Sequence, residues 1–410
     1  MDYLKEEANR CLLCKNARCM KNCPVNTPIP EIIQLYKEDQ IEKAGEILFR
    51  NNPLSAICAM VCAHENQCSG HCVKGIKGEP VEFYKIEEYI STRYLRNVQF
   101  GIAKESRDDR VAIVGSGPAG ITIAFELAMK GYKVTIFESK DRIGGVLRYG
   151  IPEFRLPKDI LDTLYEKLLQ LGVKIRFNTL IGPVITIDKL FYDGYKAVFI
   201  GTGVWNAKTL DIKGESLGNV HFAIDYLKKP DVYRLGKKVC VIGAGNVAMD
   251  AARTAKKYGA EEVRILYRKG FEDMTATKAE LKMTKESGVT FDLYKSPVEL
   301  LEEGVKYIET EKITDDSGNV ITKPIEGSDG FYGCDSIIIA VGQSPRNNII
   351  ANNKGFEINQ KGLLVIDDKG HTSRKGVFAS GDVVTGSRTV VEAVNFAKIV
   401  ASSIDDYCSN

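Results

Sequence analysis

The chain opens with a stretch in which apolar residues recur at helical spacing. Ile32, Ile33, Leu35 and Tyr36 show this spacing most clearly, after Pro28-Ile-Pro30. No run alternates as a half-buried strand would. The pattern predicts helices over 3–10, from 28 onward, over 41–49 and over 81–95. We therefore expect a small α-helical domain within the first 105 residues.

The pattern changes after a charged linker over 104–110, because short apolar runs now lead into glycines. The order strand, helix, strand occurs over 111–138 and recurs over 237–268. Units of this kind build parallel sheets. Late strands are expected over 336–340 and 376–380, and a loop between strands over 315–329. The fold class is α/β, with two Rossmann-like modules after the helical domain.

Composition excludes some classes of function. The 410 residues include 56 basic and 54 acidic ones, for a net charge of +2, and no basic block occurs. This balance argues against nucleic-acid binding. No apolar run is long enough for a membrane span, and the charged N-terminus is unlike a signal peptide. We expect a cytoplasmic protein that binds neither nucleic acid nor a membrane.

The first strand–helix turn carries a dinucleotide fingerprint. Gly115, Gly117 and Gly120 form a GxGxxG pattern that includes Pro118 and Ala119. Such glycines permit a tight turn, backbone approach to a pyrophosphate, and close helix–strand packing. Glu138 ends the next strand, where a carboxylate can accept hydrogen bonds from a ribose.

The second turn repeats this arrangement with alanine in the third place. Its predicted nucleotide contacts are Gly243, Gly245, Asn246 and Val247. Arg268 and Lys269 end the following strand, where an acid would favour NAD. A guanidinium favours the 2′-phosphate of NADP, so we expect NADP(H), with NAD(H) as the alternative.

A late acidic residue indicates which cofactor the first site holds. Gly381-Asp382 follows a short strand, and Thr389 precedes a helix. Taken alone, Asp382 could be a turn residue or a helix cap rather than a cofactor contact. Two-domain flavoproteins complete an FAD site with a late Gly-Asp, however, and the strands over 199–203 and 339–342 suit crossings between FAD and NAD(P) domains. Ala340 and Gly342 are therefore expected near NADP.

The cysteines are clustered. Eight of the 11 lie between Cys11 and Cys72, in the patterns Cx2Cx4Cx3CP and Cx3Cx5Cx3C. Zinc ribbons present two tight pairs instead, whereas a run ending in Cys-Pro is typical of ferredoxins. We favour two [4Fe–4S] clusters over zinc or redox thiols. His64 and His71 lie beside cysteines, but the thiols suffice as ligands.

These motifs resemble one family along nearly the whole chain. It comprises the small subunit of NADPH-dependent glutamate synthase, the N-terminal half of dihydropyrimidine dehydrogenase with its bacterial subunit PreT, and the large subunit of the Nfn transhydrogenase. The matching stretches are RCLLCKNARCMKNCPVNTPIP, NNPLSAICAMVCAHENQCSGHC, GGVLRYGIPEFRLP, VIGAGNVAMDAART and TGSRTVVEAVN.

The resemblance implies how the thiols divide between the clusters. The first cluster would be held by Cys11, Cys14, Cys19 and Cys72, and the second by Cys23, Cys62, Cys68 and Glu87. In the family the last ligand is often Gln or Glu on the exit helix. Composition alone would choose Cys58 instead of Glu87, and we favour Glu87.

The resemblance also places further cofactor contacts. Arg155 and Gly145, which follows Gly144, are expected near FAD. The stretch YRKGF looks like dihydropyrimidine dehydrogenase, whose Arg-Lys pair holds the 2′-phosphate. Related sequences often carry another basic residue soon after this pair, whereas Thr275 stands in that region here.

Four domain segments and a function are expected. The helical domain with two [4Fe–4S] clusters would cover 1–105, and the NAD(P)H domain 236–342. The FAD domain would be formed by two separate segments, 106–235 and 343–410. The chain would be an electron-input subunit that passes electrons from NADPH through FAD and the clusters to a catalytic partner subunit or ferredoxin-linked protein. A PreT-like subunit, an electron-bifurcating transhydrogenase subunit and a non-catalytic iron–sulfur scaffold are the alternatives.

Overall fold

The computed structural model describes residues 2–103, 105–314 and 319–409, so Lys104 of the expected linker lies outside it. The chain forms two compact units. The first consists of 1–148, 153–204 and 345–410, and the second of 149–152 and 205–344.

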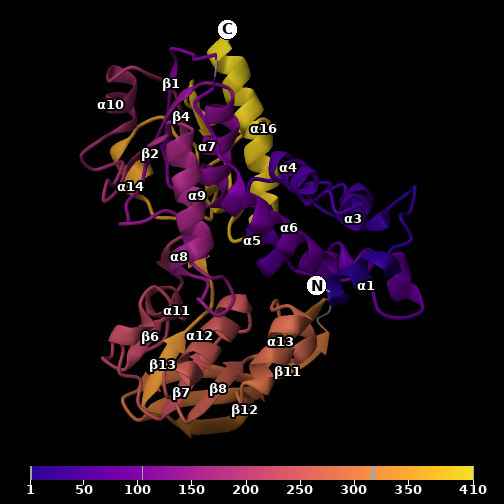
Figure 1. The fold of residues 1–410 in the computed structure, drawn as a ribbon. Coiled ribbons are helices and arrows are strands. Elements are labelled where there is room, and N and C mark those ends of the chain that lie inside the picture. Colours follow the sequence, from indigo (N-terminus) through magenta and orange to yellow (C-terminus); the bar gives the residue numbers. More distant parts are fainter. Residues whose placement is uncertain (1, 104, 315–318, 410) are drawn as a thin grey trace. The chain divides into compact units, whose positions relative to one another are not determined.

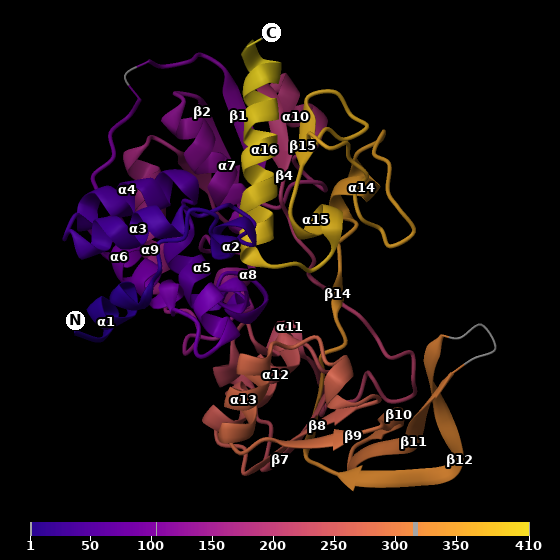
Figure 2. The ribbon, with the colours of Figure 1, turned by 90° about the vertical axis from the view of Figure 1, so that its right-hand side faces the viewer.

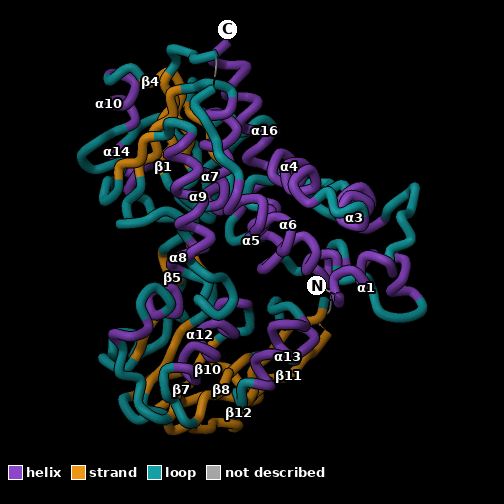
Figure 3. The backbone as a smooth tube through the Cα atoms, viewed as in Figure 1, coloured by secondary structure: helices purple, strands orange, loops and turns teal. Residues whose placement is uncertain are grey.

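The first unit begins with a helical domain, in which the described residues form no strand (Figure 3). Its core contains Ile32, Ile33, Leu48, Ile86 and Ile90, each at most 1% exposed. Its α-helices are α1 (Asp2–Arg10), α2 (Arg18–Lys21), α3 (Ile29–Lys37), α4 (Ile41–Asn51), α5 (Ser55–Val61) and α6 (Phe83–Asn97), and its short 3-10 helices are η1 (His64–Asn66), η2 (Ser69–His71) and η3 (Val73–Ile76). The predicted helices are confirmed, and the one-turn helix α2 and the helix α5 are additions. The helix α5 is the longer of the two. It is almost wholly buried and apolar, so it has no polar face for periodicity to reveal.

The rest of the first unit is a parallel five-stranded sheet, ordered β15-β4-β1-β2-β3, flanked by helices (Figure 1). The strands are β1 (Arg110–Val114), β2 (Lys133–Phe137), β3 (Lys174–Arg176), β4 (Tyr195–Ile200) and β15 (Val377–Ala379). The helices are α7 (Pro118–Met129), α8 (Val146–Tyr149), α9 (Asp159–Gln170), α10 (Ile187–Tyr192), α14 (Asn348–Asn352), α15 (Asp382–Thr385) and α16 (Val390–Ser409). Because β15 pairs with β4, the end of the chain completes the sheet begun by β1.

Within this unit the helical domain packs on the nucleotide domain. The ring of Phe49 on α4 lies edge-on to that of Phe125 on α7, with centroids 5.3 Å apart. Lys398 Nζ of α16 donates a hydrogen bond to Asn51 O at 2.6 Å. Figures 1 and 2 both show α5 beside the first turns of α16. Aromatic packing and a hydrogen bond thus join the two domains.

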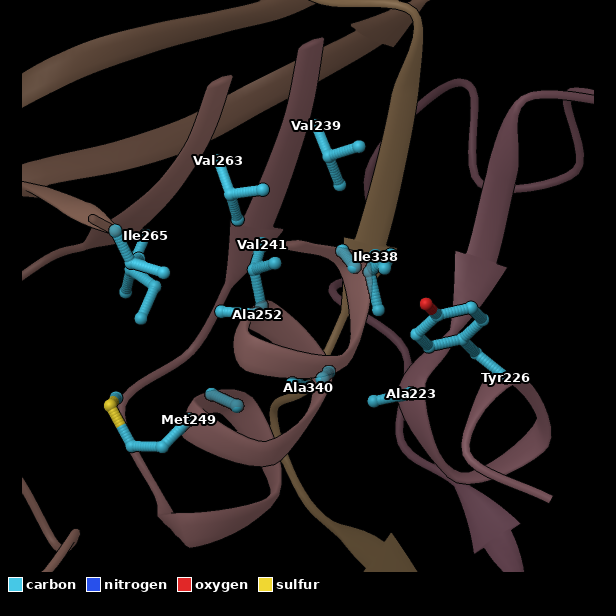
Figure 4. Close-up of a cluster of buried hydrophobic side chains, with 14 of the residues drawn as sticks. Ala223, Tyr226, Val239, Val241, Met249, Ala252, Val263, Ile265, Ile338 and Ala340 are labelled. Atoms are coloured by element: carbon cyan, nitrogen blue, oxygen red, sulfur yellow. The ribbon is translucent and has the colours of Figure 1, made fainter. Parts of the chain in front are cut away.

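The second unit contains a second parallel sheet, ordered β6-β13-β7-β8-β9. Its elements are β5 (Asn206–Ala207), β6 (Val220–Phe222), α11 (Ala223–Tyr226), η4 (Pro230–Val232), β7 (Lys238–Ile242), α12 (Asn246–Lys257), β8 (Glu262–Tyr267), η5 (Phe271–Asp273), α13 (Lys278–Glu286), β9 (Thr290–Leu293), β10 (Lys295–Leu301), β11 (Gly304–Thr314), β12 (Val320–Gly333), β13 (Ser336–Ile339) and β14 (Gln343–Ser344). Figure 4 shows Val241, Ile265 and Ile338 of the sheet packing over Met249 and Ala252 of α12.

Two sequence-based expectations differ from this unit. The prediction of a loop over 315–329 is wrong from Val320 onward, where β12 pairs with β11. Residues 315–318 lie outside the described part of the chain. The strand β12 is largely exposed, so its polar residues gave no strand pattern. The NAD(P)H domain was expected to begin at residue 236. This start leaves out β6, which pairs with β13 in the second parallel sheet. No described helix is both long and apolar enough to cross a bilayer.

Candidate cofactor sites

The first turn leaves open space beside Gly117. Gly115 has φ +99°, and a Cβ on Gly120 would lie 2.0 Å from Gly115 O, so both positions require glycine. A Cβ on Gly117 would have Gly201 O, at 4.0 Å, as its nearest neighbour. The first helix turn presents unpaired N–H groups there. This is a cradle that a dinucleotide pyrophosphate fits.

Glu138 holds this turn in place. Its Oε2 accepts hydrogen bonds from Ser116 N at 2.9 Å and Ser116 Oγ at 2.5 Å. Its Oε1 accepts from Lys140 N at 2.8 Å. The carboxylate is 5% exposed, at the end of β2. It therefore orients the turn, in addition to the ribose contact that the sequence predicts.

The late Gly-Asp pair lies beside this turn. Gly381 has φ +76°, and a Cβ there would lie 3.3 Å from Ala119 Cβ. Asp382 Oδ1 accepts a hydrogen bond from Arg388 N at 3.2 Å, but burial dominates and raises the pKa of Asp382 to about 6. The buried Ser380 hydroxyl has no hydrogen-bond partner among the described residues. A polar cofactor such as FAD fits these groups.

The remaining predicted FAD contacts have varied surroundings. A Cβ on Gly145, which has φ +53°, would lie 2.9 Å from Gly117 Cα, so this glycine adjoins the turn. Thr389 Oγ1 donates a hydrogen bond to Glu392 Oε2 at 2.5 Å and caps α16. Arg155 is half-buried in a turn at 153–155. Their contact with FAD stays a prediction.

The second turn is built in the same way. Gly243 has φ +140°, and a Cβ there would lie 2.4 Å from Ala340 O, so β7 and the end of β13 meet at this point. Asn246, the first residue of α12, accepts a hydrogen bond from Thr277 N at 3.1 Å. Val247 packs against the core, and Gly342 has φ +111°. The turn can hold a second dinucleotide.

Sequence reasoning missed a polar residue at this turn. Thr275 Oγ1 would lie 3.3 Å from a Cβ on Gly245, where backbone and ligand meet in such folds. The sequence analysis noted Thr275 only because related sequences often have a basic residue in that region. Arg268 is exposed at the end of β8, and its backbone oxygen accepts a hydrogen bond from Thr310 Oγ1 at 2.8 Å. Its exposed guanidinium is thus available to a phosphate.

One cavity brings the first set of cysteines together. Cys11, Cys14, Cys19 and Cys72 all line it, although Cys72 is distant in the sequence. Burial raises the pKa of Cys19 to about 11, so the free thiol is protonated at neutral pH and metal binding would release its proton. Nowhere among the described residues do three His, Cys, Asp or Glu side chains converge on a point for one ion. Four cysteine thiols are the ligand set that a [4Fe–4S] cluster takes.

The second set has Glu87 as a charged neighbour. Burial raises the pKa of Cys23 and Cys68, and a hydrogen bond with Cys58 raises that of Cys62; the Glu87 carboxyl raises all three further. Burial raises the pKa of Glu87 itself to about 7, against a hydrogen bond that Ser55 Oγ donates to its Oε1 at 2.7 Å. Cys58 hydrogen-bonds to Cys62. Both candidates for the fourth ligand are near, but Glu87 is the common neighbour of all three thiols.

The two histidines have partners of their own. His64 stacks on Tyr84 with ring centroids 4.3 Å apart, and its Nε2 lies 3.0 Å from Ala59 O. His71 Nδ1 lies 2.7 Å from Gln67 O. Hydrogen bonds to backbone oxygens therefore hold one nitrogen of each ring.

Two family profiles match the chain. "Pyridine nucleotide-disulphide oxidoreductase" matches residues 109–397, and "Dihydropyrimidine dehydrogenase domain II, 4Fe-4S cluster" matches residues 2–98. Together they cover the helical domain and both nucleotide modules.

Curated relatives match over almost all of the chain. The small chain of glutamate synthase [NADPH] from Escherichia coli K12 is 31% identical over 98% of this chain and 90% of its own length. The subunit PreT of NAD-dependent dihydropyrimidine dehydrogenase from the same organism is 31% identical over 98% and 93%. The beta subunit of NADP(+)-dependent formate dehydrogenase from Moorella thermoacetica is 34% identical over 95% of this chain, which spans 60% of that relative's length.

Solved structures share the fold. FprA from Mycobacterium tuberculosis in complex with NADPH has a TM-score of 0.63 at 18% identity, over 74% of this chain and 85% of its own. The chain thus belongs to the pyridine nucleotide-disulphide oxidoreductase family, among the members with an N-terminal 4Fe-4S domain, and is an NAD(P)H-dependent flavin iron–sulfur oxidoreductase that uses FAD.

Proposed function

We propose that this chain is an electron-input subunit that takes electrons from NADPH and delivers them singly to a partner protein through two [4Fe–4S] clusters. One observation carries the proposal: both thiol sets belong to a helical domain that packs directly on the nucleotide domain containing Gly117 and Asp382. Such packing favours electron transfer from a flavin to a cluster rather than to a soluble disulfide.

The chain's residues have separable roles in this proposal. The Gly243 turn and Arg268 would bind NADPH, and the Gly117 turn with Asp382 would orient FAD. FAD supplies the conversion of a two-electron hydride into single electrons. Cys11, Cys14, Cys19 and Cys72 would hold one cluster, and Cys23, Cys62, Cys68 and Glu87 the other. Hydride transfer requires no general base, and the sites contain no histidine-based proton relay among the described residues.

The terminal acceptor would be set by the partner protein. The glutamate synthase and PreT relatives are a small chain and a subunit of larger enzymes. We propose the same for this chain, with a catalytic subunit or a ferredoxin-linked protein as the partner.

Anaerobic stopped-flow reduction tests this function. Purified holoprotein mixed with NADPH should lose flavin absorbance first and the broad iron–sulfur absorbance afterwards, and EPR should then detect reduced clusters. The Asp382→Ala variant, which should lose FAD, is the control. Flavin that stays oxidised with both NADPH and NADH, or clusters that stay oxidised beside a reduced flavin, would contradict the proposal.

A further inference from the structure

The first thiol set lies close to the protein surface. Its cavity is also lined by Leu12, Arg18 and Lys74, and all three side chains are exposed. Cys11, Cys14, Cys19 and Cys72 are all partly buried, whereas in the second set only Cys23 and Cys62 are, and Cys68 and Glu87 are 8% and 7% exposed. A one-electron partner can therefore approach the first set more closely.

The segments that form this cavity are strongly basic. The lining residues lie in 11–30 and 71–81, which together contain five lysines or arginines and one acidic residue, Glu79, in a chain with almost equal numbers of both charges. All five of these cations are exposed, and we call four of them, Lys15, Arg18, Lys74 and Lys77, the basic rim. Lys15 directly follows Cys14, and Lys74 lies two residues after Cys72.

The basic rim has no internal counter-charge. None of its four cations forms an ion pair within the part of the chain that the structure describes. Elsewhere in the helical domain cations pair locally, such as Arg50 with Glu46 at 2.8 Å. Unpaired cations gathered at one surface attract an oppositely charged partner.

Two exposed apolar residues accompany the basic rim. Leu12, between Cys11 and Cys14, is 59% exposed, and Ile76, between Lys74 and Lys77, is 65% exposed. Apolar side chains bordered by charges are typical of interface centres. The surface thus offers both a charged border and small apolar contacts.

We propose that the basic rim, with Leu12 and Ile76, is the docking surface for an acidic one-electron carrier, either a separate protein or a domain of the partner subunit. This inference rests on the proposed function and specifies where the electrons leave the chain. One electron would pass from the reduced cluster that the first thiol set would hold to the oxidised carrier; no bond is broken, and NADPH is the source of the electrons.

A second reading assigns the cations to the cluster alone. A cluster held by four thiolates is anionic, so nearby cations would raise its reduction potential without any docking role. The two readings predict different behaviour with carriers of opposite charge.

Charge reversal at two rim lysines separates these readings. The variant Lys15→Glu/Lys77→Glu changes side chains outside the cavity lining, and Lys43→Glu/Lys361→Glu makes the same charge change at exposed lysines elsewhere in the first unit. Holoprotein would reduce oxidised rubredoxin, an acidic one-electron carrier, or cytochrome c, a basic one. Flavin reduction by NADPH is recorded in the same traces.

The rim variant should reduce rubredoxin about tenfold more slowly at low ionic strength, and cytochrome c no more slowly than the parent. The difference should shrink in high salt. The control variant should match the parent with both carriers. Unchanged rubredoxin reduction, or equal slowing of both carriers together with a lowered cluster potential, would overturn the docking proposal.

Protein reduced photochemically, without NADPH, provides the last comparison. This experiment isolates electron transfer from the protein to the carrier. If the rim variant still reduces rubredoxin more slowly, docking is supported even if NADPH fails to reduce the flavin. Flavin reduction that proceeds normally while the rim has no effect removes the docking proposal and leaves the proposed function intact.

Discussion

At the scale of single residues, the open question is which side chain is the fourth ligand beside Cys23, Cys62 and Cys68. Glu87 neighbours Cys23, Cys62 and Cys68, and Ser55 fixes one of its oxygens through a 2.7 Å hydrogen bond. The Ser55 hydroxyl lies 2.9 Å from Ser91 Oγ in the same buried group. One carboxylate oxygen is thus positioned by the protein, which leaves Oε2 as the oxygen that would bind iron in the proposed function.

The variants Cys58→Ala and Glu87→Ala should therefore differ. Cys58→Ala should keep the parental iron and acid-labile sulfide content and the parental EPR spectrum of the reduced clusters. Glu87→Ala should lose the iron of one cluster or change its EPR signal, because the proposal makes its carboxylate the ligand. The reverse pattern would identify Cys58 as the ligand.

Arg268 should decide the choice between the two nicotinamide nucleotides. A charge-assisted contact to the 2′-phosphate contributes about 1.5–3 kcal/mol, so Arg268→Ala should lower kcat/KM for NADPH by roughly 10–100-fold. The value for NADH should change less than about twofold, because NADH has no such phosphate. Steady-state kinetics with a dye acceptor measures both, with Lys323→Ala, an exposed lysine on β12, as the control. Equal losses for both nucleotides would exclude this role.

At the scale of elements, the turn between β1 and α7 contains one glycine that the fold requires and another that cofactor binding requires. A Cβ at position 120 would lie 2.0 Å from Gly115 O, whereas one at position 117 meets open space. Gly117 also has φ −72°, which any residue adopts. The two glycines therefore have different functions, although the motif treats them alike.

Gly120→Ala should destabilise the apoprotein by about 3 kcal/mol or more, because the helix must move away from the strand. Gly117→Ala should change apoprotein stability by less than about 0.5 kcal/mol. It should nevertheless weaken FAD binding at least about tenfold, because the methyl group occupies the cradle. Urea unfolding of the apoprotein and titration with FAD measure the two effects. Retained FAD affinity in Gly117→Ala would place the pyrophosphate elsewhere.

Element by element, the sequence predicted what strong local signals encode. Buried strands such as Val111–Val114, each followed by a glycine turn, were identifiable because apolar runs and turn residues coincide. The extent of β12 was not, because its exposed residues follow no apolar alternation and its ladder depends on β11. The approach of Thr275 to Gly245 was also hidden, since it depends on where the chain returns after β8.

At the scale of the whole molecule, the joining of domains was beyond the sequence. Motifs revealed a thiol domain and nucleotide domains, but not that Phe49 packs against both Phe100 and Phe125, with ring centroids 5.1 and 5.3 Å away. Such contacts are fixed by surfaces that come together only after each domain has folded. They bear on function because electron transfer slows steeply as cofactors move apart.

Phe49→Ala should therefore slow reduction of the clusters more than reduction of the flavin by NADPH. Removing this ring, which is 5% exposed, should cost about 3–5 kcal/mol of stability, much of it from the packing between domains. Leu48→Ala is the matched control, because Leu48 is 1% exposed on the same helix but belongs to the core of the helical domain. Stopped-flow traces at flavin and cluster wavelengths separate the two steps. If Leu48→Ala delayed the clusters as much as Phe49→Ala did, general destabilisation rather than domain packing would control the transfer.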